Sequence, residues 1–155
     1  MLKYLIVYPY ETVGKIIDFA QGAGLDPYHV AIFTRTGLLQ ATVDGVVVSP
    51  FDAFAGRYTR TFGLKVPRPG KVNEFAARVV GEKYDYFGAA TAWIYQHTKL
   101  IVPIDVEGHS FCSDLAVRAG RYCGGELFGD TPAYCIVPKM FLAELVRIGV
   151  EFNEE

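Results

Sequence analysis

The chain has 155 residues, of which 51% are hydrophobic and 14% aromatic, so we expect residues 1–155 to form one globular domain with a proper core. The formal net charge of −2 argues against a dedicated nucleic-acid-binding protein, whose surface would be strongly basic. The three cysteines cannot all pair within one chain, and no run reaches the ~18 apolar residues of a membrane span. Because the apolar run before Pro9 is too short for a signal peptide, we expect a soluble protein that is cytoplasmic or associated with a phage or virion.

The first part of the chain predicts mostly β-structure. In chain order, we expect a strand over residues 4–8, a helix over 12–21, and strands over 29–34, 38–43 and 46–49. Asp44-Gly45 is typical of a two-residue hairpin turn, so the last three strands should form an antiparallel meander that opens at His29.

In the second part of the chain, helices predominate. We expect a strand over 61–66, helices beginning near Asn73 and over 89–96, a strand over 100–106, a helix beginning near Cys112, and a helix over 138–147. Asn73 is a candidate N-cap for the first of these helices. Strands come before helices with little regular alternation, which indicates an α+β domain rather than a doubly wound sheet.

Cys112 lies where the predicted strand meets a helix. Ser110 is a candidate N-cap, which would place Cys112 in the first turn. Unpaired backbone N–H groups and the positive end of the helix dipole favour a thiolate there, and the same N–H groups can hold the oxyanion formed by attack on a carbonyl. Cys112 is therefore a candidate nucleophile, and the alternative is a small buried apolar residue.

A cysteine nucleophile needs a base, and His29 at the start of the meander is the candidate, although a lone strand histidine can also be structural. The third residue orients the imidazole through its other nitrogen, and Gln40 on the next strand is the first choice. A turn centred on Arg35-Thr36 places Gln40 diagonal to His29 and Thr42 opposite it, so Thr42 is the fallback. Either neutral residue can fix the tautomer, but neither supplies the negative charge of an aspartate.

Four segments carry a family resemblance through their order along the chain. They are His29-Val-Ala-Ile-Phe33, Leu39-Gln-Ala41 with the Asp44-Gly45 turn, Lys83-Tyr-Asp-Tyr86, and Phe111-Cys-Ser-Asp-Leu115. Together they resemble the circularly permuted papain-like enzymes of the NlpC superfamily, nearest to the YiiX-like group, whose wider kin include lecithin:retinol acyltransferase-like proteins. In this permuted group the histidine precedes the cysteine, as here. The resemblance spans about residues 27–115.

The resemblance implies an antiparallel sheet packed against helices, with the nucleophile Cys112 at a helix N-terminus, His29 as general base and Gln40 as the polar orienting residue. The implied activity is that of a cysteine peptidase or amidase that cleaves a peptide, isopeptide or peptidoglycan-type amide through an acyl-enzyme intermediate, without a cofactor. Two alternatives stay open. One is a lipid or ester acyl hydrolase or acyltransferase that uses the same site. The other is a non-catalytic binding or structural protein on this fold, and the neutral Gln40 favours this alternative.

The resemblance also implies a substrate-binding surface. Tyr84 and Asp85 belong to a turn that lies near the active site in relatives, and we expect these two residues and Ser113 to contact the substrate. The alternative for the turn is that the tyrosine packs and the aspartate ends the turn.

Other residues with reactive side chains carry weaker signals. The offset of His109 from Cys112 rarely aims two side chains at one point, and His97 is most simply a solvated residue near a helix end. Cys123 and Cys135 lack a Cys-x-x-Cys or Cys/His spacing, so we expect no metal. A basic stretch over 57–71 could meet an anionic polymer or a lipid head group, but a solvated face is the simpler interpretation.

Overall fold

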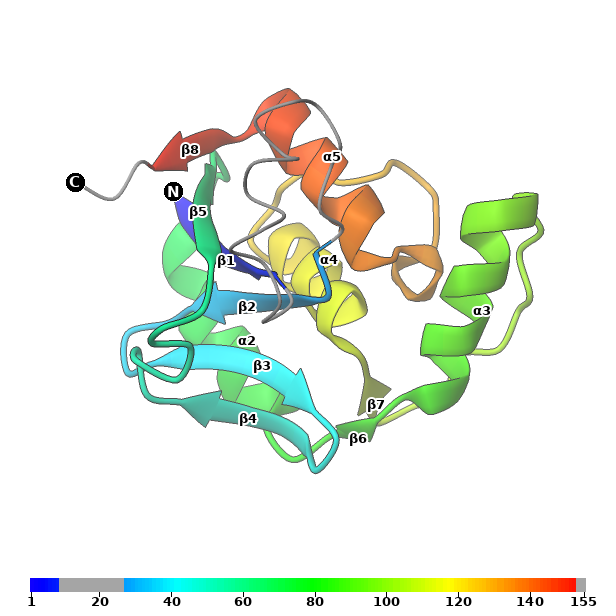
Figure 1. Ribbon diagram of the computed structural model, residues 1–155, viewed down its shortest axis with the longest axis horizontal. Coiled ribbons are helices and arrows are strands. Elements are labelled where there is room, and N and C mark those ends of the chain that lie inside the picture. The colour runs from blue at the N-terminus through cyan, green and yellow to red at the C-terminus, as the bar shows by residue number, and fades with distance from the viewer. Residues whose placement is uncertain (9–26, 153–155) are drawn as a thin grey trace.

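The computed structural model describes residues 1–8 and 27–152. In this part of the chain, one large antiparallel sheet lies beside a group of helices, so the predicted α+β class is confirmed (Figure 1). The helix predicted over residues 12–21 lies outside the described residues.

The large sheet has six strands in the order β4-β3-β2-β1-β5-β8, with every neighbouring pair antiparallel. Its strands are β1 (Leu2–Val7), β2 (His29–Phe33), β3 (Leu38–Thr42), β4 (Gly45–Ser49), β5 (Thr59–Leu64) and β8 (Val150–Phe152). The five strands predicted before residue 70 are present, although the fifth begins at Thr59 instead of residue 61. The sequence does not predict β8, because three residues are too few for an alternating pattern.

The hairpin between β3 and β4 corrects the predicted turn. Thr42 pairs with Gly45, so the two turn residues are Val43 and Asp44 rather than Asp44 and Gly45. The Thr42 hydroxyl closes this turn, because it donates to Gly45 O at 3.0 Å and accepts from Asp44 N at 3.3 Å. Gly45 has a φ of +116°, and a Cβ at this position would lie 2.5 Å from Glu82 O. The glycine is therefore needed for close approach to another segment as well as for the turn.

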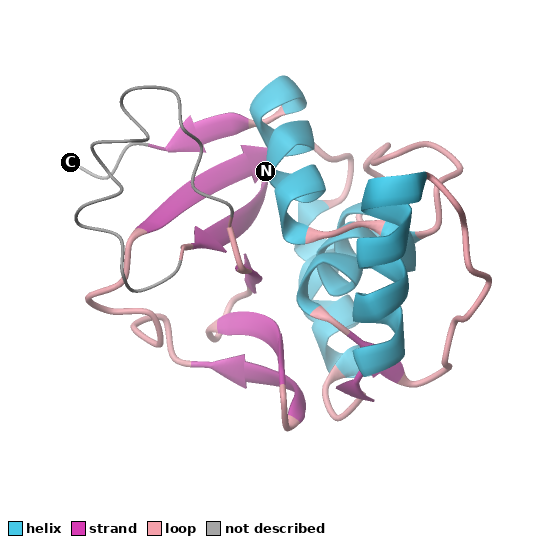
Figure 2. Cartoon of the chain, turned by 45° about the vertical axis from the view of Figure 1, so that its right-hand side comes forward, coloured by secondary structure: helices cyan, strands magenta, loops and turns pink. Residues whose placement is uncertain are grey.

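The described residues form four α-helices, which gather on one side of the sheet (Figure 2). They are α2 (Val72–Val79), α3 (Tyr86–Thr98), α4 (Cys112–Tyr122) and α5 (Pro138–Ile148), with short 3-10 turns η1 (Pro69–Lys71) and η2 (Ala133–Cys135). α4 packs on β2 and β3, and α5 packs on β5. The four predicted helices in this part of the chain are confirmed, and α3 begins earlier than predicted because Asp85 caps it by accepting from Gly88 N at 2.7 Å.

The predicted caps of α2 and α4 are wrong. The N-cap of α2 is Lys71, and Asn73 lies inside the helix, where its side chain donates to Gly70 O and accepts from Arg35 N. The N-cap of α4 is Phe111, which has extended backbone and no side-chain cap. The Ser110 hydroxyl donates instead to the Glu82 carboxylate, a partner that is distant in sequence.

Residues 100–106 form no strand in the described structure, contrary to the prediction. Leu100, Ile101 and Ile104, which contributed to the predicted strand, are exposed to solvent. The strand that leads into α4 is the two-residue β7 (His109–Ser110), which pairs in parallel with β6 (Lys83–Tyr84).

Buried apolar residues lie on both faces of the large sheet. The main cluster joins the sheet to the helices and includes Val30, Ala41 and Cys112. A smaller cluster on the other face contains Leu5, Val7, Ala31 and Leu38, with Phe33 and Phe54 packed against it. Because side chains alternate along a strand, neighbouring residues of β2 point into different clusters.

Candidate functional site

Cys112 is the first residue of α4, which agrees with its predicted place in the first turn of a helix. Its side chain is 6% exposed and lies in the main core cluster, where α4 packs on β2 and β3. All three cysteines are free thiols, but of these only Cys112 occupies the start of a helix.

Backbone N–H groups surround the Cys112 thiol, yet burial decides its pKa. Burial raises the pKa of the thiol above its ordinary value, while the N–H groups of Val30, Ser113 and Cys112 itself act in the opposite direction. The predicted preference for thiolate at the helix start is thus outweighed by desolvation of the buried sulfur. Cys112 therefore rests as a neutral thiol whose negative form would find hydrogen-bond donors already in place.

His29 and Gln40 are brought together as the sequence predicted. Ile32 pairs with Leu39 and Phe33 with Leu38, and this register, continued along the strands, puts Gln40 diagonal to His29. His29 Nε2 and Gln40 Oε1 lie 2.8 Å apart. The structure thus makes Gln40 the partner of His29 instead of the fallback Thr42, whose hydroxyl is used in the β3–β4 turn.

The Gln40 side chain determines which tautomer His29 adopts. With the amide oxygen of Gln40 as the acceptor, His29 Nε2 carries the proton and Nδ1 of the neutral ring is left with a lone pair. The Gln40 amide nitrogen donates to Ser49 Oγ at 2.7 Å. Sequence reasoning missed Ser49, although alternation along the predicted third meander strand offers it as a residue on the Gln40 side of the hairpin.

The surroundings of His29 favour the neutral imidazole. Burial lowers the pKa of His29 and the nearby Arg57 acts in the same direction, while the hydrogen bond to Gln40 raises it. The imidazole ring lies 5.5 Å from the Phe54 ring and 6.0 Å from the Tyr28 ring, between centroids. At pH 7 the imidazole is therefore able to accept a proton.

His29 and Cys112 approach the same end of β2 from different faces of the sheet. The His29 ring contacts Phe54, which packs against the smaller cluster, whereas Cys112 belongs to the main cluster. No hydrogen bond joins the two side chains in the described part of the chain. What connects them is Val30, which follows His29 in β2 and whose N–H group stabilises the Cys112 thiolate.

Comparison of the chain with protein-family models, curated proteins and solved structures found no match. The resemblance to the NlpC superfamily therefore stays a prediction that rests on the four sequence segments.

The remaining predicted site residues differ in how they lie. Tyr84 is half-buried, and its pKa is raised by burial first and then by the negative charge of a Cys112 thiolate, which places the phenol near the sulfur. Asp85 is buried and is used as the cap of α3, while the buried Ser113 hydroxyl donates to Ile136 O at 2.6 Å. Tyr84 is thus the predicted substrate-binding residue whose side chain remains available, and Asp85 is turned to a structural hydrogen bond. The Ser113 hydroxyl bonds to Ile136 O and also acts on the Cys112 thiolate, where it lowers the pKa of the thiol.

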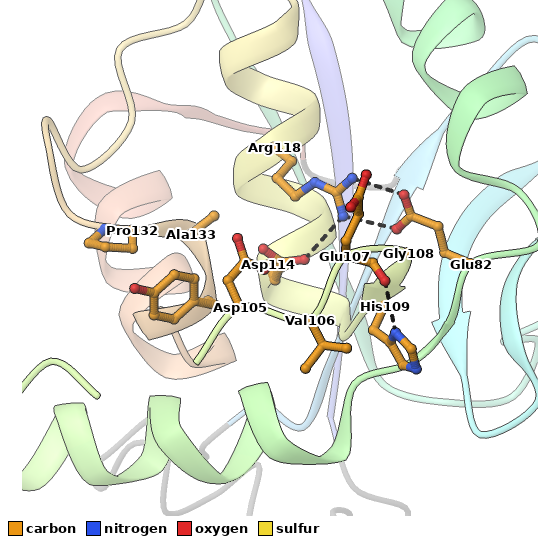
Figure 3. Close-up of a pocket in the computed structure, with 11 residues that line it drawn as sticks. Glu82, Asp105, Val106, Glu107, Gly108, His109, Asp114, Arg118, Pro132 and Ala133 are labelled. Atoms are coloured by element: carbon orange, nitrogen blue, oxygen red, sulfur yellow. Dashed lines mark hydrogen bonds and ion pairs between the residues drawn. The ribbon is translucent and has the colours of Figure 1, made fainter. Parts of the chain in front are cut away.

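A cavity of about 700 Å³ lies along α4 and was not foreseen (Figure 3). Arg118 lines this cavity, where it forms two hydrogen bonds with Glu82 at 2.9 and 3.0 Å and lies 3.5 Å from Asp114. Burial raises the pKa of Asp114 to about 7, against the opposing effect of Arg118. Asp114 follows Cys112 by two positions on the helix, so it points to a different side of α4 from the thiol. The sequence signal was available, because Asp114 and Arg118 have the spacing of a helical ion pair.

In the described ranges 1–8 and 27–152, no three His, Cys, Asp or Glu side chains are grouped so that they could hold a metal ion. Among the described helices, none is long and apolar enough to cross a membrane. His109 lines the cavity with its ring near Glu107 O, and the His97 ring lies near Trp93 O.

Proposed function

We propose that the protein is a cysteine hydrolase with a permuted papain-like domain, and that it cleaves an amide bond of a peptide, isopeptide or peptidoglycan-type substrate. The observation that carries this proposal is the hydrogen bond between His29 Nε2 and Gln40 Oε1, because it leaves Nδ1 as a proton acceptor. The position of Cys112 at the start of α4, beside Val30 N–H, supplies a nucleophile next to the strand that carries the base.

The reaction begins with two neutral groups. His29 Nδ1 takes the proton of the Cys112 thiol as the sulfur attacks the substrate carbonyl carbon, so a C–S bond forms and the carbonyl oxygen becomes an oxyanion. N–H groups at the helix start hold this oxyanion. The C–N bond then breaks and the imidazolium returns its proton to the leaving amine. Water attacks the thioester with His29 again as base, the C–S bond breaks to release the acid, and the imidazolium returns the proton to the Cys112 thiolate.

The resting structure requires one movement for this reaction. His29 and Cys112 must come into contact around the start of β2, since they lie on different faces of the sheet and share no hydrogen bond in the described structure. Tyr84, which lies near the sulfur, is the side chain we expect to contact the bound acyl group.

A second function is favoured by a specific observation. The raised pKa of the Cys112 thiol, with no imidazole hydrogen-bonded to it in the described residues, is what a non-catalytic binding protein on this fold would show. In that case the site recognises a peptide or lipid without cleaving it.

Acyl-enzyme trapping separates the two functions. The protein is mixed with p-nitrophenyl acetate, quenched with acid and digested, and the acetylated cysteine is identified by mass spectrometry. The hydrolase predicts rapid acetylation of Cys112 over Cys123 and Cys135, and loss of that preference in His29→Ala. Equal labelling of the cysteines, or labelling that ignores His29→Ala, would refute the hydrolase.

The trapping experiment is followed by a substrate screen. Fluorogenic peptides, lysine isopeptides and muropeptides are compared in the parent protein, Cys112→Ala and Thr42→Ala. Thr42→Ala is the matched control, because the Thr42 hydroxyl closes the β3–β4 turn and does not bond to His29, so turnover should stay unchanged once folding is verified. Turnover that survives Cys112→Ala would mean that the thiol is not the nucleophile.

A further inference from the structure

α3 presents its largest apolar side chains to solvent. The face that packs on the protein carries the small residues Gly88, Thr91 and Ala92, while Phe87 and Trp93 are 70% and 60% exposed. A helix that folds only to cover a core shows the opposite arrangement, with its large apolar side chains turned inward. The exposed face of α3 is therefore built to meet something apolar.

The segment after α3 extends the same surface. Leu100 and Ile101, which come shortly after the last residue of α3 in the chain, are exposed, and so is Ile104. We name the exposed side chains of residues 86–104 the α3 face; its large apolar members are Tyr86, Phe87, Trp93, Leu100, Ile101 and Ile104. Single exposed apolar residues are ordinary, but a run of six along one helix and its exit marks an interaction surface.

The charges of this segment select the kind of partner. Between residues 86 and 104 the sequence contains no Asp or Glu, and its sole Lys or Arg is Lys99, at the C-terminal end of the helix. Within residues 86–104 no carboxylate would have to be buried when this face binds a lipid surface; the first carboxylates beyond the face are the buried Asp85 and the exposed Asp105. Lys99 can keep its ammonium group among the head groups while its stem lies along the apolar boundary.

The residue types and the position of α3 point the same way. Tyr, Trp and Phe are the side chains that settle at the boundary between head groups and acyl chains. α3 stands at the edge of the molecule, away from the large sheet, so a flat surface can reach it (Figure 1). We propose that the α3 face docks the protein on the surface of a lipid bilayer, with Trp93 and Phe87 inserted at the depth of the head groups.

Trp93 is the only tryptophan of the chain, so it reports directly on this surface. The full chain is titrated with vesicles of phosphatidylcholine and with vesicles that also contain phosphatidylglycerol, and Trp93 emission and co-sedimentation are followed. Docking predicts a blue shift of the emission, protection from acrylamide, quenching by lipids brominated near the head of the acyl chain, and stronger binding to the anionic vesicles.

Variants locate the binding surface while they leave Trp93 in place. Phe87→Asp and Ile101→Asp put a charge on exposed positions of the α3 face, and each should weaken partitioning about tenfold or more. Val43→Asp is the matched control, because Val43 is 71% exposed but belongs to the β3–β4 turn and is not part of the α3 face. It should bind vesicles like the parent protein.

Three outcomes would overturn the proposal. They are an emission spectrum that vesicles do not change, vesicle binding that survives Phe87→Asp and Ile101→Asp, and a blue shift that appears without lipid as protein concentration rises. The last result would show that the α3 face binds a second copy of the chain instead. None of these readouts depends on hydrolysis, so the docking proposal can fail or succeed separately from the proposed function.

Discussion

Asp114→Asn is expected to stabilise the protein in a way that depends on pH. The Asp114 carboxyl is 7% exposed, and burial raises its pKa from 3.8 to about 7 even though Arg118 is close. The folded state therefore keeps a proton on Asp114 between these pH values, where the unfolded chain has lost it. The stability that comes from Asp114 is fully present below pH 3.8 and is lost as the pH rises through 7.

The size of the effect follows from the same shift in pKa. A pKa shift of one unit is equivalent to about 1.36 kcal/mol, so the rise in the pKa of Asp114 from 3.8 to about 7 corresponds to about 4 kcal/mol as an upper bound. Asparagine has nearly the same shape and cannot ionise, and Arg118 keeps its two hydrogen bonds to Glu82. We expect the variant to match the parent near pH 4 and to exceed it by a few kcal/mol at pH 8.

Urea unfolding followed by circular dichroism at several pH values measures this difference. Asp52→Asn is the control, because Asp52 is exposed and its replacement should shift the free energy of unfolding little at any pH. A difference between parent and Asp114→Asn that stays constant from pH 4 to pH 8 would refute the reasoning. It would mean that the buried carboxyl ionises as readily as it does in the unfolded chain.

Three further outcomes are expected. Gln40→Ala should lower the pKa of His29, because the Gln40 hydrogen bond raises it, and should reduce turnover by about 10- to 100-fold; NMR titration of His29 and steady-state kinetics test this, and an unchanged titration would contradict it. Iodoacetamide should label Cys112 with a pH midpoint above the ordinary thiol pKa, since burial raises the pKa of this thiol. Peptide mass spectrometry at graded pH measures the midpoint, and a value below the ordinary thiol pKa would contradict this prediction. Gly45→Ala should cost about 1–3 kcal/mol because of its positive φ and the nearby Glu82 carbonyl, and a melting temperature equal to that of the parent would contradict this.

Local patterns predicted much of the sheet and one contact of the site. Alternation and turn residues placed the meander, and a turn centred on Arg35-Thr36 was enough to put Gln40 within reach of His29. Spacing of apolar residues likewise placed α4 with Cys112 at its start.

What failed depends on contacts that are distant in sequence. The Ser110 hydroxyl was expected to cap α4 but bonds to Glu82, which no local pattern could reveal. The apolar residues of 100–106 suggested a strand, yet pairing is decided by the rest of the fold, and here several of them lie on the surface. The pKa of Cys112 was misjudged for the same reason, because helix position is local and burial is not.

Glu82 contacts both the β3–β4 hairpin and α4, the first through its backbone carbonyl and the second through its carboxylate. Its backbone carbonyl accepts from Val46 N at 2.8 Å, in the hairpin whose other strand carries Gln40, and its carboxylate binds Arg118 on the helix that starts at Cys112. Glu82 thereby links the hairpin that carries Gln40 to the helix that starts at Cys112. Exchange of the Val46 amide with deuterium should consequently report on the anchoring of α4, and Arg118→Met should speed that exchange at a site on the other side of Glu82.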